Sequence, residues 1–388
     1  MAQIRDLMMN LIASEVCGAP LALAPLENVD EESLKSLYAL SSFHDLSHIV
    51  ASALLKGSLA KSGSETLAKF EKQMMTALYR YEQIRFAYDE LTEALEDFGI
   101  DFIPLKGSVL RDYYPEPWMR TSCDIDILVR KDDIDKACDM LTQRLAYTDK
   151  HLGSHDVSFY TSGGVHIELH YDLLEDDRAN ACRDILSEVW SFAIKKEGTE
   201  HWYELSDDMF YFYHIAHIAK HLEIGGCGAR PFLDLWILLH KIEYDKEARS
   251  ALLLRGKLLR FAEVSERLTE IWFGGAEHDA LTLKLEEFIT CGGTYGTREN
   301  RVAALRTKSG GKLKYLLSKV FLSYDVIKYQ YPVLLKHKWL LPVANVRRWF
   351  KLIFCGGARR SLREMKMNNN FSAEQEKEIA SLFEEIGL

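Results

Sequence analysis

The chain has 388 residues, of which 47% are hydrophobic and 27% charged, so it is long enough for two or three globular domains. Its formal net charge of −10 argues against general affinity for nucleic acid, which depends on many Lys and Arg contacts to phosphate. Its seven cysteines form no CxxC pair, which favours reduced thiols over a zinc site or a disulfide framework.

The N-terminal residues lack the basic segment and apolar core that are typical of a signal peptide. No stretch reaches about 18 uncharged apolar residues, the length at which a transmembrane helix is expected. The sequence therefore predicts a cytoplasmic protein without a transmembrane segment.

Residues 1–97 are expected to form an N-terminal helical region. Apolar residues recur there at spacings of three and four, the pattern of an amphipathic helix. The helices predicted in this way span 7–16, 31–40, 49–55 and 65–98. The last of them runs directly into Gly99, so we expect it to pack against the sheet that follows.

Residues 98–174 alternate between strand and helix patterns, and residues 175–388 are predicted to be a mostly helical C-terminal domain. The fold class is therefore α+β, a small mixed sheet flanked by helices. The predicted core elements are strand 101–105, helix 108–114, strand 123–130, helix 132–145, and strands 155–161 and 164–171. The turn Ser162-Gly163-Gly164 predicts a hairpin, and the polar segment 174–181 is the expected boundary.

Two acids in one strand are the most informative feature. Asp124 and Asp126 alternate with Ile125 and Ile127, so both carboxylates share one face, with Cα atoms about 7 Å apart. A solvated strand face is the structural alternative, but acids are poor strand formers. Two carboxylates that approach to about 4 Å repel by roughly 4 kcal/mol and call for a cation, for which Mg²⁺ or Mn²⁺ is the oxygen-preferring choice.

A third acid, Glu168, lies in a later alternating strand, where His166 and His170 share its face. Two imidazoles and a carboxylate on one strand are also a possible ligand set for a zinc or manganese hydrolase. Lining a nucleotide pocket is the other use for these histidines.

Lys106-Gly107-Ser108 follows the first core strand. Glycine permits close approach of the backbone, and a helix that begins near Ser108 would offer N–H groups to a phosphate. A simple N-cap role for Ser108 is the alternative. Lys106 and Arg120 are the cationic candidates for phosphate binding.

The strings LKGSVL, DIDILV and IELHYDL, spread over about residues 103–172, resemble the nucleotidyltransferase superfamily related to DNA polymerase β. Within it they resemble a bacterial branch of largely uncharacterised nucleotidyltransferases. The resemblance implies that Asp124, Asp126 and Glu168 hold divalent ions, with Glu168 as general base or ligand of a second ion. It implies transfer of an NMP group from an NTP such as ATP to an unknown hydroxyl or phosphate acceptor, with release of pyrophosphate.

Behind this core, His214, His217 and His221 form one stripe of a predicted helix, and Arg230 and Asp234 follow a glycine-rich break. His217 and His221 have the spacing of metal ligands, but the weak resemblance in this region favours contact with nucleotide or acceptor. A buried network in which Asp234 orients a histidine is the structural alternative.

Residues 312–354 alternate basic residues with aromatics and leucines. A helical pair with its apolar stripe inward is favoured, and contact with a membrane surface or an anionic partner is the alternative. Ser372 is a predicted N-cap for a short final helix.

Two functions besides the transferase remain open from the sequence alone. One is a non-catalytic nucleotide-binding protein on the same fold. The other is the metallohydrolase built on His166, Glu168 and His170.

Overall fold

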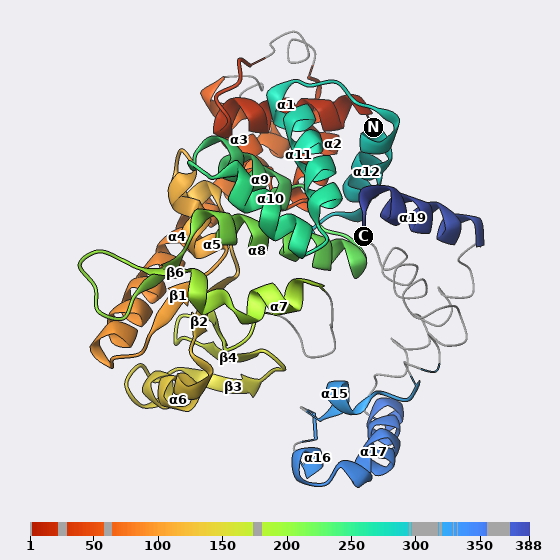
Figure 1. Cartoon of the computed structure of the whole chain (residues 1–388). Coiled ribbons are helices and arrows are strands. Elements are labelled where there is room, and N and C mark those ends of the chain that lie inside the picture. Colours follow the sequence, from red (N-terminus) through yellow and green to blue (C-terminus); the bar gives the residue numbers. More distant parts are fainter. Residues whose placement is uncertain are drawn as a thin grey trace.

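A five-stranded mixed sheet is the centre of the fold (Figure 1). The computed structural model describes residues 2–21, 29–57, 64–173, 181–294, 296, most of 317–354, and 373–388. The strand order is β1-β2-β5-β4-β3, in which only the β2–β5 pair is parallel. The strands are β1 (Phe102–Pro104), β2 (Asp124–Val129), β3 (Thr148–Leu152), β4 (Asp156–Tyr160) and β5 (His166–His170).

The two faces of the sheet have different environments because side chains alternate along each strand. Ile125, Ile127 and Ile167 belong to a buried cluster that also contains residues of α4 (Glu65–Asp97) and α6 (Ile134–Gln143). The opposite face carries the acidic residues of β2 and β5. Near the end of β2, Leu128 packs into a second, larger core that the helices form.

That larger core contains helices from both ends of the chain. Helices α1 (Ala2–Val16), α2 (Glu31–Phe43) and α3 (Ser47–Lys56) share one buried cluster with the C-terminal helices, and α1 packs against α11. The C-terminal members are α7 (Ala181–Ser187), α8 (Asp207–Glu223), α9 (Arg230–His240), α10 (Lys246–Arg255), α11 (Leu259–Gly274), α12 (Ala280–Gly292) and α19 (Ala373–Ile386). The division into three domains stays a prediction.

The helices begin and end at residues suited to those positions. The Asp30 carboxylate caps α2 by accepting the N–H of Ser33 at 2.8 Å, and Ser64 caps α4 through Leu67. Gly275 ends α11 with φ +79°, a conformation that favours glycine.

The α+β prediction and the hairpin at Gly163-Gly164 are confirmed, since β4 and β5 pair antiparallel across that turn. Three local details differ. Strand β3 was not expected, because all five of its residues are exposed and it has no apolar alternation. The helix expected over 108–114 is a four-residue α-helix, α5 (Gly107–Leu110), followed by a 3₁₀ turn (Arg111–Tyr113).

The third difference is a small hairpin in a region predicted to be mostly helical. Strands β6 (Ala193–Lys195) and β7 (Tyr203–Leu205) pair antiparallel, and the Phe102 N–H donates to the His201 carbonyl beside β1 at 3.0 Å. The predicted cap Ser372 and nearly all of the expected boundary segment lie outside the described residues. No helix in the described part of the chain is both long enough and apolar enough to cross a bilayer.

Candidate active site

The three predicted acids meet on one face of the sheet. The parallel register places Asp126 beside Glu168 and Asp124 beside His166. Because neighbouring parallel strands present equivalent positions to the same side, the carboxylates of β2 and β5 project together, away from the face covered by α4 and α6. The sequence predicted this convergence, and the structure brings the three side chains together.

Two groups of potential metal ligands share Glu168. Asp124, His166 and Glu168 form one group, and Asp126, Glu168 and His170 form the other, with ligand atoms of each group within 4.8 Å of one another. Each group contains two carboxylates and one imidazole. This donor set fits a divalent cation such as Mg²⁺ or Mn²⁺, which prefers carboxylate oxygens and completes its coordination with water or phosphate.

Asp126 is buried between two basic groups. Its Oδ1 accepts hydrogen bonds from Lys106 Nζ at 3.1 Å and from His170 Nε2 at 2.8 Å. Burial by itself raises the pKa of Asp126, but the charge of Lys106 and the bond from His170 outweigh it and hold the pKa below its usual range. Asp126 is therefore ionised and ready to bind a cation.

Asp124 has the opposite electrostatics. Burial and then repulsion from Asp126 raise the pKa of its carboxyl group, against the opposing charge of Lys106. Two neighbouring carboxylates cannot both be ionised cheaply without a compensating cation. This repulsion is the physical reason why the acidic face suits a metal ion.

Lys106 reaches this face from a strained turn. Its backbone has φ +46° and ψ −118°, which residues with a side chain rarely adopt, and it directly precedes α5. Burial lowers the pKa of Lys106, but the charge of Asp126 outweighs that effect and raises it. The strained turn thus holds a half-buried, charged ammonium group against the carboxylates.

Gly107 and Ser108 are placed differently from each other. A Cβ at Gly107 would lie 3.4 Å from Arg120 Nη1, so glycine lets the backbone approach that guanidinium closely. Ser108 is the second residue of α5 and not its N-cap, because the helix begins at Gly107. It lines a cavity of about 160 Å³ with Pro104, Asp112 and other residues, among which the acids of β2 and β5 are absent.

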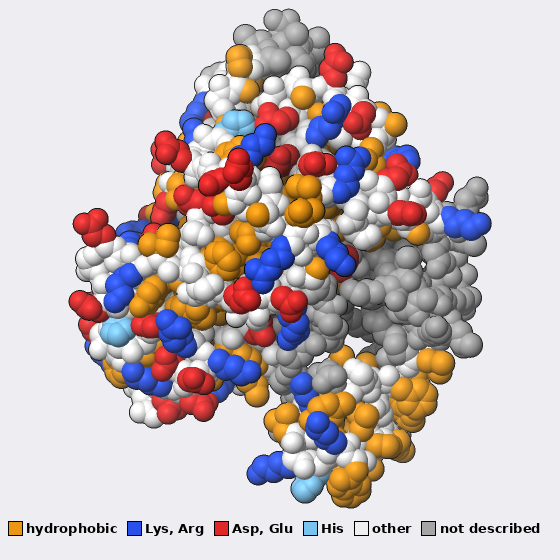
Figure 2. Space-filling model, in the orientation of Figure 1, with side chains coloured by type: hydrophobic (Ala, Val, Ile, Leu, Met, Phe, Trp, Pro, Cys, Tyr) orange, Lys and Arg blue, Asp and Glu red, His pale blue; other side chains and the backbone are white. Residues whose placement is uncertain are grey.

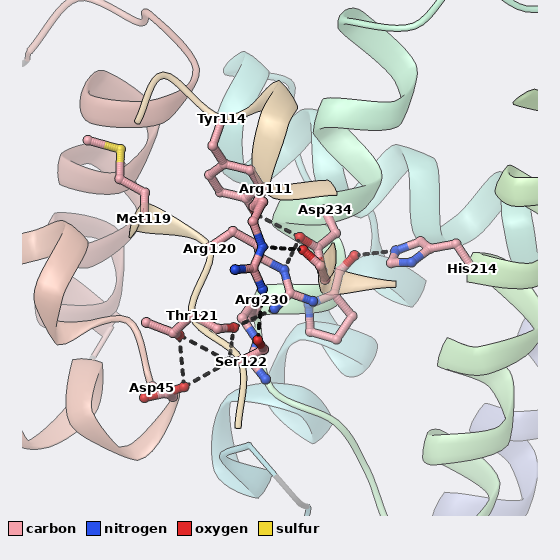
Figure 3. Close-up of polar contacts among 12 residues, drawn as sticks. Asp45, Arg111, Tyr114, Met119, Arg120, Thr121, Ser122, His214, Arg230 and Asp234 are labelled. Carbon is pink, nitrogen blue, oxygen red and sulfur yellow. Dashed lines mark hydrogen bonds and ion pairs between the residues drawn. The ribbon is translucent and has the colours of Figure 1, made fainter. Parts of the chain in front are cut away.

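Arg120 is held by the C-terminal helices (Figure 3). Its Nε donates to Asp234 Oδ1 at 2.7 Å, and the Tyr114 hydroxyl donates to the same oxygen at 2.7 Å. Burial raises the pKa of Asp234, but the charge of Arg120 outweighs it and lowers the pKa, so the pair is ionised. Asp234 is buried in a network, as in the structural alternative, but its hydrogen-bond partners are Arg120 and Tyr114 instead of a histidine.

Comparison with protein families shows which family the chain belongs to. A family model for uncharacterised nucleotidyltransferases matches residues 30–274, well over half of the chain. The chain belongs to this nucleotidyltransferase family. Comparison with curated proteins and with solved structures gives no match. The matched segment contains every candidate site residue, so the sequence resemblance is confirmed at the level of the family and of a transferase activity.

Two residues of this nucleotidyltransferase escaped sequence reasoning. Arg111 is buried; its Nε donates to the Gly107 carbonyl and its Nη2 to Ser122 Oγ, both at 3.0 Å. Tyr213 is buried near the acidic face, where burial raises its pKa to about 12 against the opposing charge of Lys106. Neither residue stands in a motif, and only packing reveals their positions.

The histidine stripe of α8 divides in two. His214 Nε2 pairs with the Pro231 carbonyl at 2.8 Å, away from the carboxylates. His217 and His221 face each other, with 3.2 Å between their Nε2 atoms, and burial and then the charge of Lys106 lower the pKa of His217. Among the described residues, no third Cys, His, Asp or Glu completes a metal-binding group with this pair.

The hydrolase arrangement expected from His166, Glu168 and His170 does not form as one site. The two histidines stand four residues apart on an extended strand, about 13 Å between Cα atoms. They belong to separate ligand groups, each completed by an aspartate of β2. The family match supports a transferase instead of that alternative.

Proposed function

We propose that this nucleotidyltransferase moves an NMP group from an NTP such as ATP to a hydroxyl or phosphate acceptor, using Mg²⁺ or Mn²⁺ on the acidic face. The observation that carries the proposal is the shared Glu168, which links the two aspartates of β2 into two adjoining ligand groups. Superfamily resemblance in the sequence and the family match support the same reaction.

In this proposal Asp124, Asp126 and Glu168 hold the cation. When bound, it would neutralise charge on the phosphates and lower the pKa of the acceptor hydroxyl. Lys106 adds a positive charge beside Asp126, and Arg120, fixed by Asp234, supplies a second one next to Gly107. The phosphates of the nucleotide are therefore expected near Lys106, Gly107 and Arg120.

The chemistry is an in-line displacement. The acceptor oxygen forms a bond to the α-phosphorus while the bond to the pyrophosphate oxygen breaks. For a hydroxyl acceptor, Glu168 takes the proton, since its side chain is 25% exposed and can reach a bound substrate. His170 hydrogen bonds to Asp126 and approaches Glu168 Oε2 at 3.4 Å, which positions both carboxylates.

Helix α8 contributes a group of side chains near Lys106 that we call the α8 wall: Tyr213, His217 and His221. Both Tyr213 and His217 interact electrostatically with Lys106. We assign this wall to contact with the nucleotide or the acceptor. The low pKa of His217 suits that role, because a neutral imidazole accepts as well as donates hydrogen bonds.

The test compares Asp124→Asn and Asp126→Asn with Asp132→Asn, an exposed acid close in sequence. Each protein is incubated with each NTP, a divalent metal and a cell extract, and pyrophosphate release and labelled products are measured. We expect the first two variants to lose more than about 100-fold in turnover, beyond what loss of a merely orienting residue costs. Asp132→Asn should retain it.

Circular dichroism and thermal melting establish that the variants are folded. Turnover that survives in folded Asp124→Asn or Asp126→Asn protein contradicts the proposal. Turnover of wild-type protein that is unchanged after chelation of divalent ions contradicts the metal requirement.

A further inference from the structure

The described part of residues 317–354 forms a small lobe with its own core. Helices α15 (Tyr324–Ile327), α16 (Val333–Lys336) and α17 (Leu341–Phe354) pack around Ile327, Leu334 and Ala344. Asn345 of α17 connects this helix to the segment before α15, because its Oδ1 accepts the Leu322 N–H at 2.9 Å. In Figure 1 the lobe stands beside the main body. The lobe lies beyond residue 274, where the family match ends.

Large apolar side chains are exposed on this lobe. Trp339 is 75% exposed, Val343 59% and Leu335 52%. Val343 and Val346 lie three residues apart on α17 and so share one side of the helix, with Arg347 next to them. The expected helical pair with its apolar stripe inward describes the lobe only in part, because Ile327, Leu334 and Ala344 face inward whereas these side chains do not. Residues 312–316 of that stretch lie outside the described residues.

Positive charge accompanies the apolar side chains. Residues 301–366 contain sixteen Lys and Arg but only two acids, Asp325 and Glu364, although the whole chain has a net charge of −10. Lys336, Lys338 and Arg347 are exposed near Trp339 and Val343 in the sequence. Figure 2 shows the visible side of the lobe covered by hydrophobic and basic side chains.

We propose that this lobe docks the protein on the surface of an anionic membrane. Exposed tryptophan and aliphatic side chains can enter the boundary between headgroups and acyl chains, while Lys and Arg bind the anionic headgroups. Nucleic acid would satisfy the positive charge but would leave Val343, Val346 and Leu335 exposed to water, so it explains only half of the surface.

The experiment measures binding of the full-length protein to vesicles by flotation. One set of vesicles contains 70% phosphatidylcholine and 30% phosphatidylglycerol, and the other contains phosphatidylcholine alone. We expect binding to the first set that weakens as salt is raised, and at least tenfold weaker binding to the second. No salt-dependent preference for the anionic vesicles would overturn the proposal.

Two variants locate the contact. The apolar variant carries Trp339→Ala, Val343→Ser and Val346→Ser, and the charge variant carries Lys336→Glu and Lys338→Glu. Each should bind anionic vesicles at least tenfold more weakly, with an unchanged melting temperature because all five residues are exposed. Binding that neither variant weakens overturns the assignment to the lobe.

Matched controls change the same kinds of residue elsewhere. Phe86→Ala combined with Leu254→Ala removes two apolar side chains that are 71% and 67% exposed on the main body. Lys241→Glu combined with Lys246→Glu reverses two exposed charges there. These proteins should float like the wild type, and equal losses in controls and lobe variants count against the proposal. Binding to single-stranded RNA without binding to vesicles would assign the lobe to nucleic acid and overturn it.

Discussion

Two buried aspartates, Asp126 and Asp234, show how single residues build the site. Each is almost fully buried, and each has a basic partner: Lys106 for Asp126 and Arg120 for Asp234. Burying a carboxylate without such a partner would cost several kcal/mol of folding free energy. Each aspartate therefore fixes the position of its basic side chain. For Asp234 that means holding Arg120 next to Gly107.

Replacing Asp234 by Ala should therefore destabilise the protein strongly. It leaves Arg120 and the Tyr114 hydroxyl buried without their common acceptor, and we expect a loss of about 3–5 kcal/mol in the free energy of unfolding. The exposed pair of Glu82 and Arg85 is the control, where Glu82→Gln should cost less than about 1 kcal/mol. Urea denaturation measures both. A loss below 1 kcal/mol for Asp234→Ala would show that the pair does not hold Arg120.

At the scale of elements, the turn between β1 and α5 combines strain and function. Lys106 has φ +46° in this turn, and its side chain reaches back to Asp126. Backbone strain of this kind costs about 1–3 kcal/mol and persists where the surrounding structure enforces it. A lysine in a position that suits glycine indicates that its ammonium group is needed there.

Comparison of Lys106→Gly with Lys106→Ala separates strain from charge. Both variants lose the ammonium group, but only glycine adopts this backbone conformation without strain. We expect the Gly variant to be more stable than the Ala variant by about 1–3 kcal/mol, the reverse of the order in ordinary helices. Denaturation curves measure this difference in the free energy of unfolding. Both variants should lose turnover, because both lack the ammonium group. Equal stability of the two would mean that the turn relaxes and stores no strain.

For the whole molecule, the arrangement of the two cores decides how the site is supported. The acidic face belongs to a sheet whose other side is covered by α4 and α6. The α8 wall, formed by Tyr213, His217 and His221, comes from a helix of the larger core. That core is shared by α1–α3 and the C-terminal helices. The site therefore depends on helices that precede and follow the sheet in the sequence.

Loss of packing in α1 should destabilise the C-terminal helices. Ile12 is fully buried in the shared core, so Ile12→Ala should lower the free energy of unfolding by about 2–5 kcal/mol. Hydrogen exchange should accelerate in α11, which packs against α1. Leu254→Ala, at a side chain 67% exposed, is the control and should change neither measurement. Unchanged exchange in α11 would indicate that the two ends of the chain are energetically independent.

Most local features of this protein follow from patterns in its sequence. Alternation put Asp124 and Asp126 on one face of their strand, and it put His166, Glu168 and His170 on one face of theirs, because side-chain direction depends only on position along a strand. Spacing of apolar residues gave most of the helices, and the glycine turn gave the β4–β5 hairpin. An exposed strand such as β3 has no such pattern, so it could not be predicted.

The pairing of these faces, in contrast, depends on contacts between residues that are distant in the sequence. Strand β5 lies parallel to β2, although β3 and β4 come between them in the sequence, and this brings Glu168 beside Asp126. Arg120 and Asp234 are 114 residues apart, and Tyr213 reaches the acidic face from α8. Such pairings follow from the order of strands and the packing of helices. They bring together buried charges that lie far apart in the sequence, which no local pattern encodes.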